Sequence, residues 1–498
     1  MNLTPYKTLE ARFARLGALQ DATAMLQWDS ATLMPAGGAA ARSEQLATLK
    51  VVCHETLTDP STADLLDGAE AQNDLDQWQR ANLAEMRRLW LHSTAVPADL
   101  VAALSKACSA SEMRWREARP AGDFALVLPE LRRVLGLVRE AAAAKAERLG
   151  KSPYEALLDE YEPGGSTAVI DRLFDDLAGR LPTLIERALE AQSRRPAPLV
   201  PDGPFPIEAQ RQIGLELMQR LGFDFEHGRL DVSLHPFCGG TPDDVRLTTR
   251  YDEADFGRAL MGVLHETGHA LYERGLPEAW RRQPVGHARS MSIHESQSLL
   301  IEMQACRSRE FLEFAAPLLC RRFNGSSRAW DAENLYRLNT RVARSFIRVD
   351  ADEVTYPAHV ILRYRLERAL IAGELAPEDL PAAWNDAMRV LLGVVPPSDR
   401  EGCLQDIHWY DGAWGYFPTY TLGAMTAAQL FDAARRADAR VVPGIARGDF
   451  APLLAWLREN VHQKASRYST AEIVAQASGR PLDAATYERH IERRYVAA

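Results

Sequence analysis

The sequence lacks the features that would place it in a membrane, in an oxidising compartment or in a repeat architecture. Nowhere do about 18 apolar residues run together, and the first residues carry no charged segment followed by an apolar one, so we expect neither a membrane span nor a signal peptide. The six cysteines include no Cys-x-x-Cys pair, which is typical of reduced thiols in a cytoplasmic protein. No segment of about 20 to 50 residues repeats, which argues against a solenoid.

A surplus of basic residues is also missing. The 58 Lys and Arg are outnumbered by 68 Asp and Glu, and the net charge of −10 argues against binding to nucleic acid or to an anionic membrane. With 46% hydrophobic and 25% charged residues, the composition is that of a globular protein whose 498 residues can bury a large core without disulfides.

Most of the chain is predicted to be helical, because Ala, Leu, Arg and Glu dominate and apolar residues recur at spacings of three and four. The clearest examples are residues 80–93, 125–150, 168–195 and 207–221. Five prolines between Arg195 and Pro206 cannot lie inside a helix, and they predict an extended connector after a helical front third. The fold class is therefore mainly α.

One pair of strands is predicted after this connector. Residues Arg229–Phe237 and Asp244–Tyr251 are the two strands, the second alternates in polarity, and Gly239 and Gly240 lie between them, so we expect a hairpin. The free edge of such a hairpin could accept an extended peptide as a further strand. A hairpin that only stabilises the fold agrees equally well with the sequence.

A metal-binding motif lies in the middle of a predicted helix, Phe256–Gly275. His265 and His269 are one helical turn apart, so both can give an imidazole nitrogen to one zinc ion at about 2.0 to 2.1 Å. Glu266 is rotated by about 100° from His265 and can reach a water molecule without becoming a ligand. By chance, roughly 0.02 such motifs are expected in a chain of this composition, so the pattern is specific.

Two details of this helix are open. Asp252 or Asp255 can cap its start. Gly268 is unusual, because a glycine inside a helix costs about 1 kcal/mol relative to alanine. Close approach of a neighbouring backbone or of substrate would explain it.

A catalytic zinc needs a third protein ligand. His287, His294, Glu295 and Glu302 follow the motif and are all chemically able, and spacing does not decide among them. Glu295 could instead complete a capping box with Ser292 at a helix start.

Residues 345–354 are predicted to belong to a helix with Arg341, Arg344 and Arg348 on one stripe. Such a stripe is typical of a solvated face. Arg348 also has Asp352 one turn further on, and an oriented guanidinium is suited to bidentate capture of a carboxylate.

The segment Gly402–Gly423 is rich in aromatic residues and glycine. His408, Tyr416 and Tyr420 could polarise a carbonyl or hold its oxyanion in a dry cleft, and we count Tyr416 among the substrate-binding candidates. Ordinary packing with satisfied polar tips is the alternative for each of them.

Several further segments occur in order along the chain. They are Trp28–Pro35 with Gly37, Gly38 and Arg42, Tyr154–Gly164, His235–Phe237, Asp244–Thr248, His265–His269, His294–Gln297, Ile347–Asp352 and Gly402–Trp409. With this series the chain resembles, over nearly its whole length, the carboxypeptidase Taq family of metallocarboxypeptidases. Cys238 departs from the resemblance, because Ser or Thr is expected after His-Pro-Phe.

The resemblance implies a metallocarboxypeptidase that releases amino acids from peptides with a free C-terminus. It implies one zinc ion per chain on His265, His269 and Glu295, with Glu266 as catalytic base. Cobalt or manganese could replace zinc on these ligands. It further implies Arg348 as the residue for the substrate carboxylate, and a surrounding cleft formed by His235, Arg246, His408 and Tyr420.

The resemblance also implies a helical saddle with a deep groove and a small hairpin at the active site, an architecture similar to that of neurolysin and angiotensin-converting enzyme. Members of the family are usually homodimers. We expect a single domain, 1–498, with a helical front half, 1–195, along the groove and a catalytic half, 207–498. An endo-oligopeptidase or dipeptidyl carboxypeptidase could use the same zinc site. A non-catalytic zinc-containing peptide-binding protein is opposed by Glu266, which a closed structural site does not need.

Overall fold

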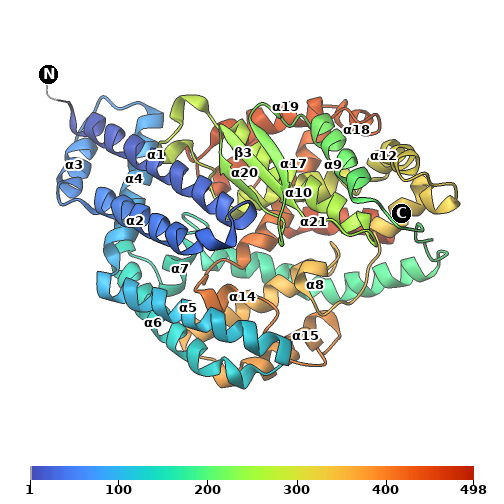
Figure 1. Ribbon diagram of the computed structural model, residues 1–498, viewed down its shortest axis with the longest axis horizontal. Helices are drawn as coiled ribbons and strands as arrows, with labels where there is room; N and C mark the ends of the chain where they lie inside the picture. Colours follow the sequence, from blue (N-terminus) through green and yellow to red (C-terminus); the bar gives the residue numbers. More distant parts are fainter. Residues whose placement is uncertain (1–2, 498) are drawn as a thin grey trace. The chain divides into compact units, whose positions relative to one another are not determined.

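The structure, a computed structural model, describes residues 3–497 and is mainly helical with one small sheet (Figure 1). The chain divides into two compact units. Unit 1 comprises the residues up to Ser93, Pro198–Asn339 and Thr426–Leu482, and unit 2 comprises Thr94–Ala197, Thr340–Met425 and the residues from Asp483 onward. No helix within residues 3–497 has the length and apolar character that a bilayer crossing requires. All six cysteines are free.

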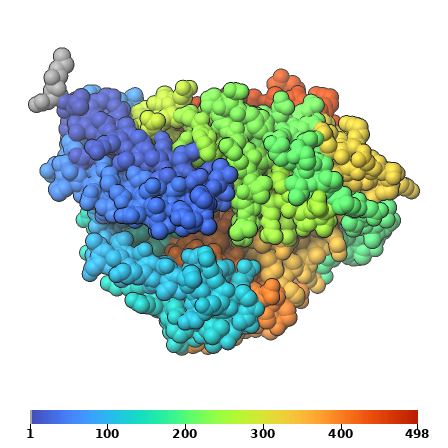
Figure 2. Space-filling view, viewed as in Figure 1, coloured from blue at the N-terminus to red at the C-terminus, as the bar shows by residue number. Residues whose placement is uncertain are grey.

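Unit 1 begins with helices that form a small core of their own around Leu9, Phe13 and Leu66. They are α1 (Pro5–Thr32), the short turn η1 (Ala36–Gly38), α2 (Ala39–Thr58), α3 (Ser61–Glu70) and α4 (Gln77–Ala95). Helices α1 and α2, in dark blue, lie at the surface of the molecule in Figure 2, and α2 contains no buried residue.

The rest of unit 1 contains the sheet and the helices around it. The helices are α9 (Ile207–Leu221), α10 (Phe256–Gly275), α11 (Met291–Leu299), α12 (Arg309–Arg322), α13 (Ala332–Asn339), α18 (Val441–Ile445), α19 (Ala451–Asn460) and α20 (Thr470–Ser478). Short turns are η3 (Glu278–Trp280), η4 (Pro284–Gly286), η6 (Arg328–Trp330) and η9 (His462–Lys464). A π-helical segment, η5 (Leu300–Cys306), continues α11.

The sheet is mixed, and the predicted antiparallel hairpin is wrong in its first strand. The strands β1 (Gly228–Val232), β2 (Cys238–Thr241) and β3 (Asp244–Thr249) lie in the order β1-β3-β2. β1 runs parallel to β3, and the antiparallel partner of β3 is β2, which the prediction placed in the turn. Gly240 has a φ of 90°, and a Cβ there would lie 2.1 Å from the carbonyl oxygen of Asp244, so its two hydrogens permit the tight return that forms β2.

Helix α10 packs against both the sheet and α9 in one apolar core. Met218 of α9, Val245 and Leu247 of β3, and Val263 and Ala270 of α10 are buried in one cluster. Because these apolar residues of α10 recur with helical spacing, one face of the helix is buried and its orientation is fixed. The polar residues of the motif lie on the same helix.

Unit 2 contains the remaining elements. They are α5 (Ala98–Ala121), η2 (Phe124–Leu126), α6 (Leu128–Leu149), α7 (Pro153–Leu158), α8 (Thr167–Ser193), η7 (Arg348–Asp350), α14 (Tyr356–Ala372), η8 (Pro377–Asp379), α15 (Leu380–Leu392), α16 (His408–Asp411), α21 (Ala484–Ile491) and the π-helical η10 (Glu492–Val496). Helix α17 (Pro418–Ala437) passes from unit 2 into unit 1.

The four predicted helices are confirmed as α4, α6, α8 and α9, and no helix or strand interrupts residues 195–206. The predicted helix over 345–354 is wrong. This segment is irregular apart from the single turn η7, because the carboxylate of Asp352 accepts hydrogen bonds from the backbone nitrogens of Ala343, Val354 and Thr355 and so fixes a non-helical path.

Candidate metal centre

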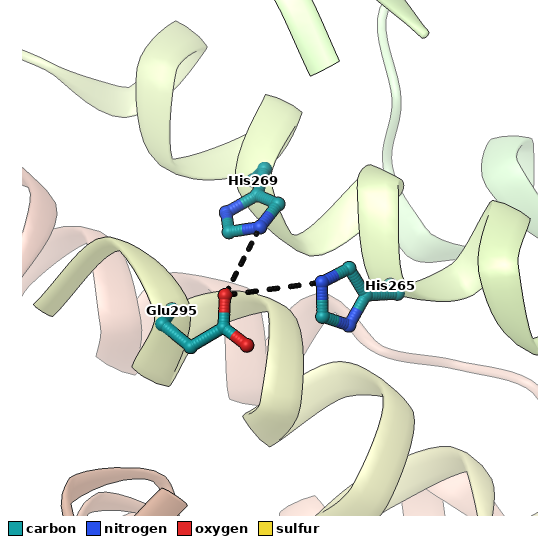
Figure 3. Close-up of side chains that lie close together, drawn as sticks. All are labelled: His265, His269 and Glu295. Carbon is teal, nitrogen blue, oxygen red and sulfur yellow. Dashed lines mark ion pairs between the residues drawn. The ribbon is translucent and has the colours of Figure 1, made fainter. Parts of the chain in front are cut away.

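Helix α10 presents the two histidines of the motif together. Its limits, Phe256–Gly275, agree with the prediction, and of the two proposed caps Asp255 is the one used, since its side chain accepts from the backbone nitrogens of Gly257 and Arg258. The rings of His265 and His269 have centroids 5.0 Å apart. Both lie close to the carboxylate of Glu295 (Figure 3).

Glu295 comes from the neighbouring helix α11. Its Oε2 lies 3.5 Å from His269 Nε2 and 3.9 Å from His265 Nε2 (Figure 3). One ligand atom from each of the three residues lies within 4.8 Å of the others. Two ligands bound at about 2.0 to 2.1 Å to a tetrahedral zinc are about 3.3 Å apart, so this spacing and this donor set fit a single ion.

Gly268 explains how α11 comes so close. A Cβ at this position would lie 2.5 Å from the carbonyl oxygen of Gln297 and 2.6 Å from the Cα of Ser298. The close approach of a neighbouring backbone, one of the two reasons expected for this glycine, is therefore what the structure has. The contact allows Glu295 to reach the histidines from the adjacent helix.

The capping-box alternative for Glu295 is wrong. The cap of α11 is Ser290, whose hydroxyl accepts from the backbone nitrogen of Ile293. Ser292 lies inside the helix, one residue after its start. The Glu295 carboxylate is consequently available to the two histidines instead of the helix end.

The other three candidates for the third ligand are not part of the cluster. Glu302, in η5, has its Oε2 2.9 Å from His265 Nδ1. His294 has its Nδ1 2.6 Å from His269 Nδ1. Both therefore contact the histidine nitrogen that faces away from Glu295, whereas His287 joins neither contact. The geometry favours Glu295 among the four.

Burial and neighbouring charges shift the titration of these groups. Burial raises the pKa of Glu266 to about 7. Burial and the nearby His294 lower the pKa of His269 to about 4. For His265, burial is outweighed by the Glu302 hydrogen bond and the surrounding carboxylates, which raise its pKa to about 10. For Glu295, burial is outweighed by the two histidines, which lower its pKa to about 2. The cluster thus pairs carboxylates with imidazoles in a largely buried place.

A second polar group lies in unit 2 around Arg348. Its Nε and Nη2 donate to Asp406 Oδ1 at 3.0 and 2.8 Å, and Arg363 Nε donates to Asp406 Oδ2 at 2.7 Å. The expected partner, Asp352, is instead bound to backbone. Arg348 is 7% exposed and Arg363 is fully buried. A solvated arginine stripe is therefore wrong for Arg348.

The aromatic candidates surround this arginine. The Arg348 guanidinium lies 4.7 Å from the ring centroid of Tyr420. Tyr420 and His408 are joined by a hydrogen bond of 3.2 Å between the hydroxyl and Nε2. The ring of Tyr416 lies 5.1 Å from that of Tyr420 and 5.6 Å from that of His408. The structure thus brings four predicted residues of unit 2 together.

The two candidates near the sheet are not part of either group. His235 is exposed in the turn between β1 and β2. Arg246, on β3, donates to both carboxylate oxygens of Asp244, at 2.9 and 2.6 Å. Cys238, on β2, is half-buried, and the pKa of its thiol is raised well above its usual range by burial and, secondarily, by Glu266.

Sequence reasoning missed several charged residues at these sites. Glu273 bonds His294 at 2.8 Å and Arg307 donates to Glu302 at 2.6 Å, while Asp406 joins Arg348 to Arg363. The spacing of Glu273, one turn after His269 on the same helix, was the available signal for the first. Arg307 follows its partner Glu302 by five residues, a spacing that does not match one turn of an α-helix, and Arg363 meets Asp406 from 43 residues away.

Known proteins resemble this chain over nearly its whole length. The family model described as carboxypeptidase Taq (M32) metallopeptidase matches residues 8–495. Thermostable carboxypeptidase 1 of Thermus thermophilus is 39% identical, over 100% of this chain and 98% of its own. The protein of the same name from Pyrococcus furiosus is 36% identical, over 98% of both chains.

Solved structures agree. Metallocarboxypeptidase 1 of Trypanosoma cruzi superposes with a TM-score of 0.96 at 42% identity, covering 99% of both chains. An M32 carboxypeptidase from Deinococcus radiodurans superposes with a TM-score of 0.93 at 36% identity, again covering 99% of both.

Proposed function

Because the chain belongs to the carboxypeptidase Taq (M32) metallopeptidase family and is thus a metallocarboxypeptidase that acts on peptides, we propose that it uses a zinc ion held by His265, His269 and Glu295. The observation that carries the proposal is the convergence of these three ligand atoms within 4.8 Å. When bound, zinc acidifies a water molecule and polarises the scissile carbonyl. Cobalt or manganese could take its place on the same ligands.

Glu266 is proposed as the general base. It follows the ligand His265 on α10, is 7% exposed, and lies close enough to His265 and Glu295 for their charges to shift its pKa. Its carboxylate would take a proton from the attacking water and later deliver that proton to the leaving amine. A base in a dry pocket holds the proton at a defined atom between the two steps.

Arg348 is proposed to pair with the C-terminal carboxylate of the substrate. Arg348 and Arg363 share one carboxylate, Asp406, so the three groups carry a net charge of +1 in a buried place. A buried excess charge is costly unless an opposite charge meets it. A substrate carboxylate would supply that charge, which supports removal of residues from a free C-terminus.

The remaining predicted residues keep supporting roles in the proposal. His408, Tyr416 and Tyr420 are proposed as donors to the carbonyl or its oxyanion, and His235 and Arg246 as further substrate contacts. The homodimer, the cytoplasmic location and the lack of a nucleic-acid partner stay predictions from the sequence.

The proposed base is tested with Glu266→Gln. The amide keeps the shape of the side chain and cannot accept the proton, so we expect zinc content equal to wild type and a kcat lower by about 10²- to 10⁴-fold. Release of the C-terminal amino acid from a blocked dipeptide measures kcat, and atomic absorption measures zinc.

The matched control is Glu278→Gln, which makes the same chemical change at an exposed position of unit 1. It should leave both zinc content and kcat unchanged. Near-normal turnover of a zinc-loaded Glu266→Gln protein would exclude Glu266 as the base.

Two alternative peptidase activities could use the same metal site. An endo-oligopeptidase would cleave a peptide and its C-terminally amidated form alike, and a dipeptidyl carboxypeptidase would release dipeptides. The proposal expects single amino acids from the free acid and little from the amide. A peptide-binding protein without activity would release neither.

A further inference from the structure

A chain of three side chains leads away from the candidate metal position through His269. His269 Nδ1 lies 2.6 Å from His294 Nδ1, and His294 Nε2 lies 2.8 Å from Glu273 Oε1. The side chains of His269 and His294 are 13% and 16% exposed, and that of Glu273 is 27% exposed. Two helices supply all three residues, since His269 and Glu273 are one turn apart on α10 and His294 precedes Glu295 on α11.

A metal bound at His269 Nε2 would fix the position of each proton in this chain. An ionised carboxylate only accepts, so His294 Nε2 must carry a hydrogen that it donates to Glu273. For His269 to offer its Nε2 lone pair to a metal, its Nδ1 must carry the hydrogen between the two rings, and His294 must accept that hydrogen at Nδ1. His269 is left with its lone pair at Nε2, the atom that lies 3.5 Å from Glu295.

The other histidine reaches the same state by a shorter route. His265 Nδ1 donates directly to Glu302, which Arg307 holds through a hydrogen bond of 2.6 Å. In the neutral form that binds a metal, the lone pair of His265 is therefore also at Nε2. A metal-binding histidine commonly donates its other nitrogen to a carboxylate, which sets its tautomer and its ring orientation. At His269 the partner of Nδ1 is instead the imidazole of His294, and the carboxylate, Glu273, binds the far side of that imidazole.

We propose that Glu273 and His294 are positioning residues that fix the tautomer and orientation of His269 for metal binding. Glu273 acts only through His294, as Glu302 acts directly on His265. The inference rests on the proposed metal site and goes beyond it, because it assigns a role to two residues that do not contact the metal.

The test compares two uncharged substitutions of similar length, Glu273→Gln and Glu273→Met. Gln keeps an oxygen that can accept from His294, and its amide nitrogen can reach water because the site is partly exposed. Met has no such acceptor. We expect zinc affinity within about threefold of wild type for Gln and a loss of about 10- to 100-fold for Met, measured by competition with a chromophoric chelator.

The same substitutions in a protein without the His294 imidazole test whether Glu273 acts through His294. In His294→Ala the zinc affinity should already be reduced by a similar factor, and adding Glu273→Gln or Glu273→Met should then make no difference. Circular dichroism and thermal unfolding of the metal-free variants report whether they are folded. If Glu273→Met does not fold, Glu273→Ala, which also lacks the acceptor, takes its place, with the same expected loss beside His294 and no further loss in His294→Ala.

Equal zinc affinity in Gln, Met and wild-type proteins would overturn the inference. So would a Gln-to-Met difference that persists without His294. Because the readout is metal affinity, a protein that binds zinc as expected and hydrolyses no peptide would contradict the proposed function and leave this inference standing.

Discussion

At residue 268, the absence of one methyl group sets the distance between α10 and α11. The Cβ that any other residue would bring lies 2.5 Å from a backbone oxygen of α11, closer than real contacts permit. Backbone cannot give way as a flexible side chain can, so the two helices would have to separate. Glu295 is on the helix that would move, and the ligand cluster depends on its position.

We therefore expect Gly268→Ala to weaken both the fold and the metal site. Overpacking costs about 1 to 3 kcal/mol and outweighs the gain of about 1 kcal/mol that alanine brings to a helix. Zinc affinity should fall by about tenfold or more as Glu295 shifts. Thermal unfolding of the metal-free protein and chelator competition measure the two effects.

Gly179 on α8 supplies the matched control. It is an exposed helix-interior glycine, and a methyl group added there would meet no atom within 4 Å, so Gly179→Ala should stabilise by about 0.5 to 1 kcal/mol and leave zinc affinity unchanged. If both substitutions were stabilising, the close packing of α10 on α11 would not be what requires Gly268.

The residues of the site differ in how far the sequence could predict them. His265, Glu266 and His269 follow from one helical turn, because their relation is local. Glu295 needed the resemblance to a family to be chosen over its rivals, since its approach depends on Gly268. Asp406 was out of reach, because it meets Arg348 from 58 positions further along the chain.

Among the elements, the C-terminal helices of unit 2 are bound by one buried carboxylate. Glu353, 3% exposed, accepts from His490 Nε2 at 2.7 Å in α21 and from Arg494 Nη1 at 3.2 Å and the Tyr495 hydroxyl at 2.8 Å in η10. The Tyr487 hydroxyl donates to its backbone oxygen. Burial would raise the pKa of Glu353, but His490 and Arg494 outweigh it and lower the pKa to about 2.

The sign of the pH dependence follows from this shift. Because the folded pKa of Glu353 lies below the unfolded value, its contribution to stability is present above about pH 4.5 and is lost as the pH falls towards 2. Glu353→Gln should destabilise the protein by about 3 to 5 kcal/mol at pH 7. The difference from wild type should shrink as the pH falls from 5 to 3, measured by urea unfolding at each pH.

Glu374→Gln is the control for this prediction, since Glu374 is exposed just beyond α14 in the same unit. Its free energy of unfolding should equal that of the wild-type protein at every pH. A gap between wild type and Glu353→Gln that stays constant down to pH 3 would contradict the assignment of a charged Glu353 to the folded state.

The elements that the sequence predicted well are long and periodic, such as α6, α8 and α10. The wrong predictions concern short segments whose sequence pattern is compatible with more than one structure. Alternating polarity marks β3 as a strand but does not encode whether β1 runs parallel to it. Arginines at spacings of three and four around Arg348 suit a helix, yet Asp352 binds the backbone of that segment and prevents one.

For the whole molecule, the two groups of functional candidates belong to different compact units. The three clustered ligands, Glu266 and the chain through His294 are all in unit 1, whereas Arg348, Asp406 and the aromatic residues around them are in unit 2. A ligand that binds the folded state stabilises the structure that carries its contacts. Metal binding should therefore stabilise unit 1 more than unit 2.

We expect removal of the metal to lower stability and to loosen α10 and α11 before other helices. With zinc at about 1,000 times its Kd, binding contributes about 4 kcal/mol to the free energy of unfolding, and a chelator should abolish that gain. Hydrogen exchange followed by mass spectrometry should show faster deuterium uptake in α10, α11 and η5 of the chelated protein, because local opening there is no longer opposed by the ion. Helices α6 and α8 of unit 2 serve as internal controls, and peptidase activity should return when zinc is restored. Uptake that rises equally in all of these helices would mean that the ion supports the global fold and not the packing of α10 on α11, and unchanged uptake would mean that His265, His269 and Glu295 are held in place without it.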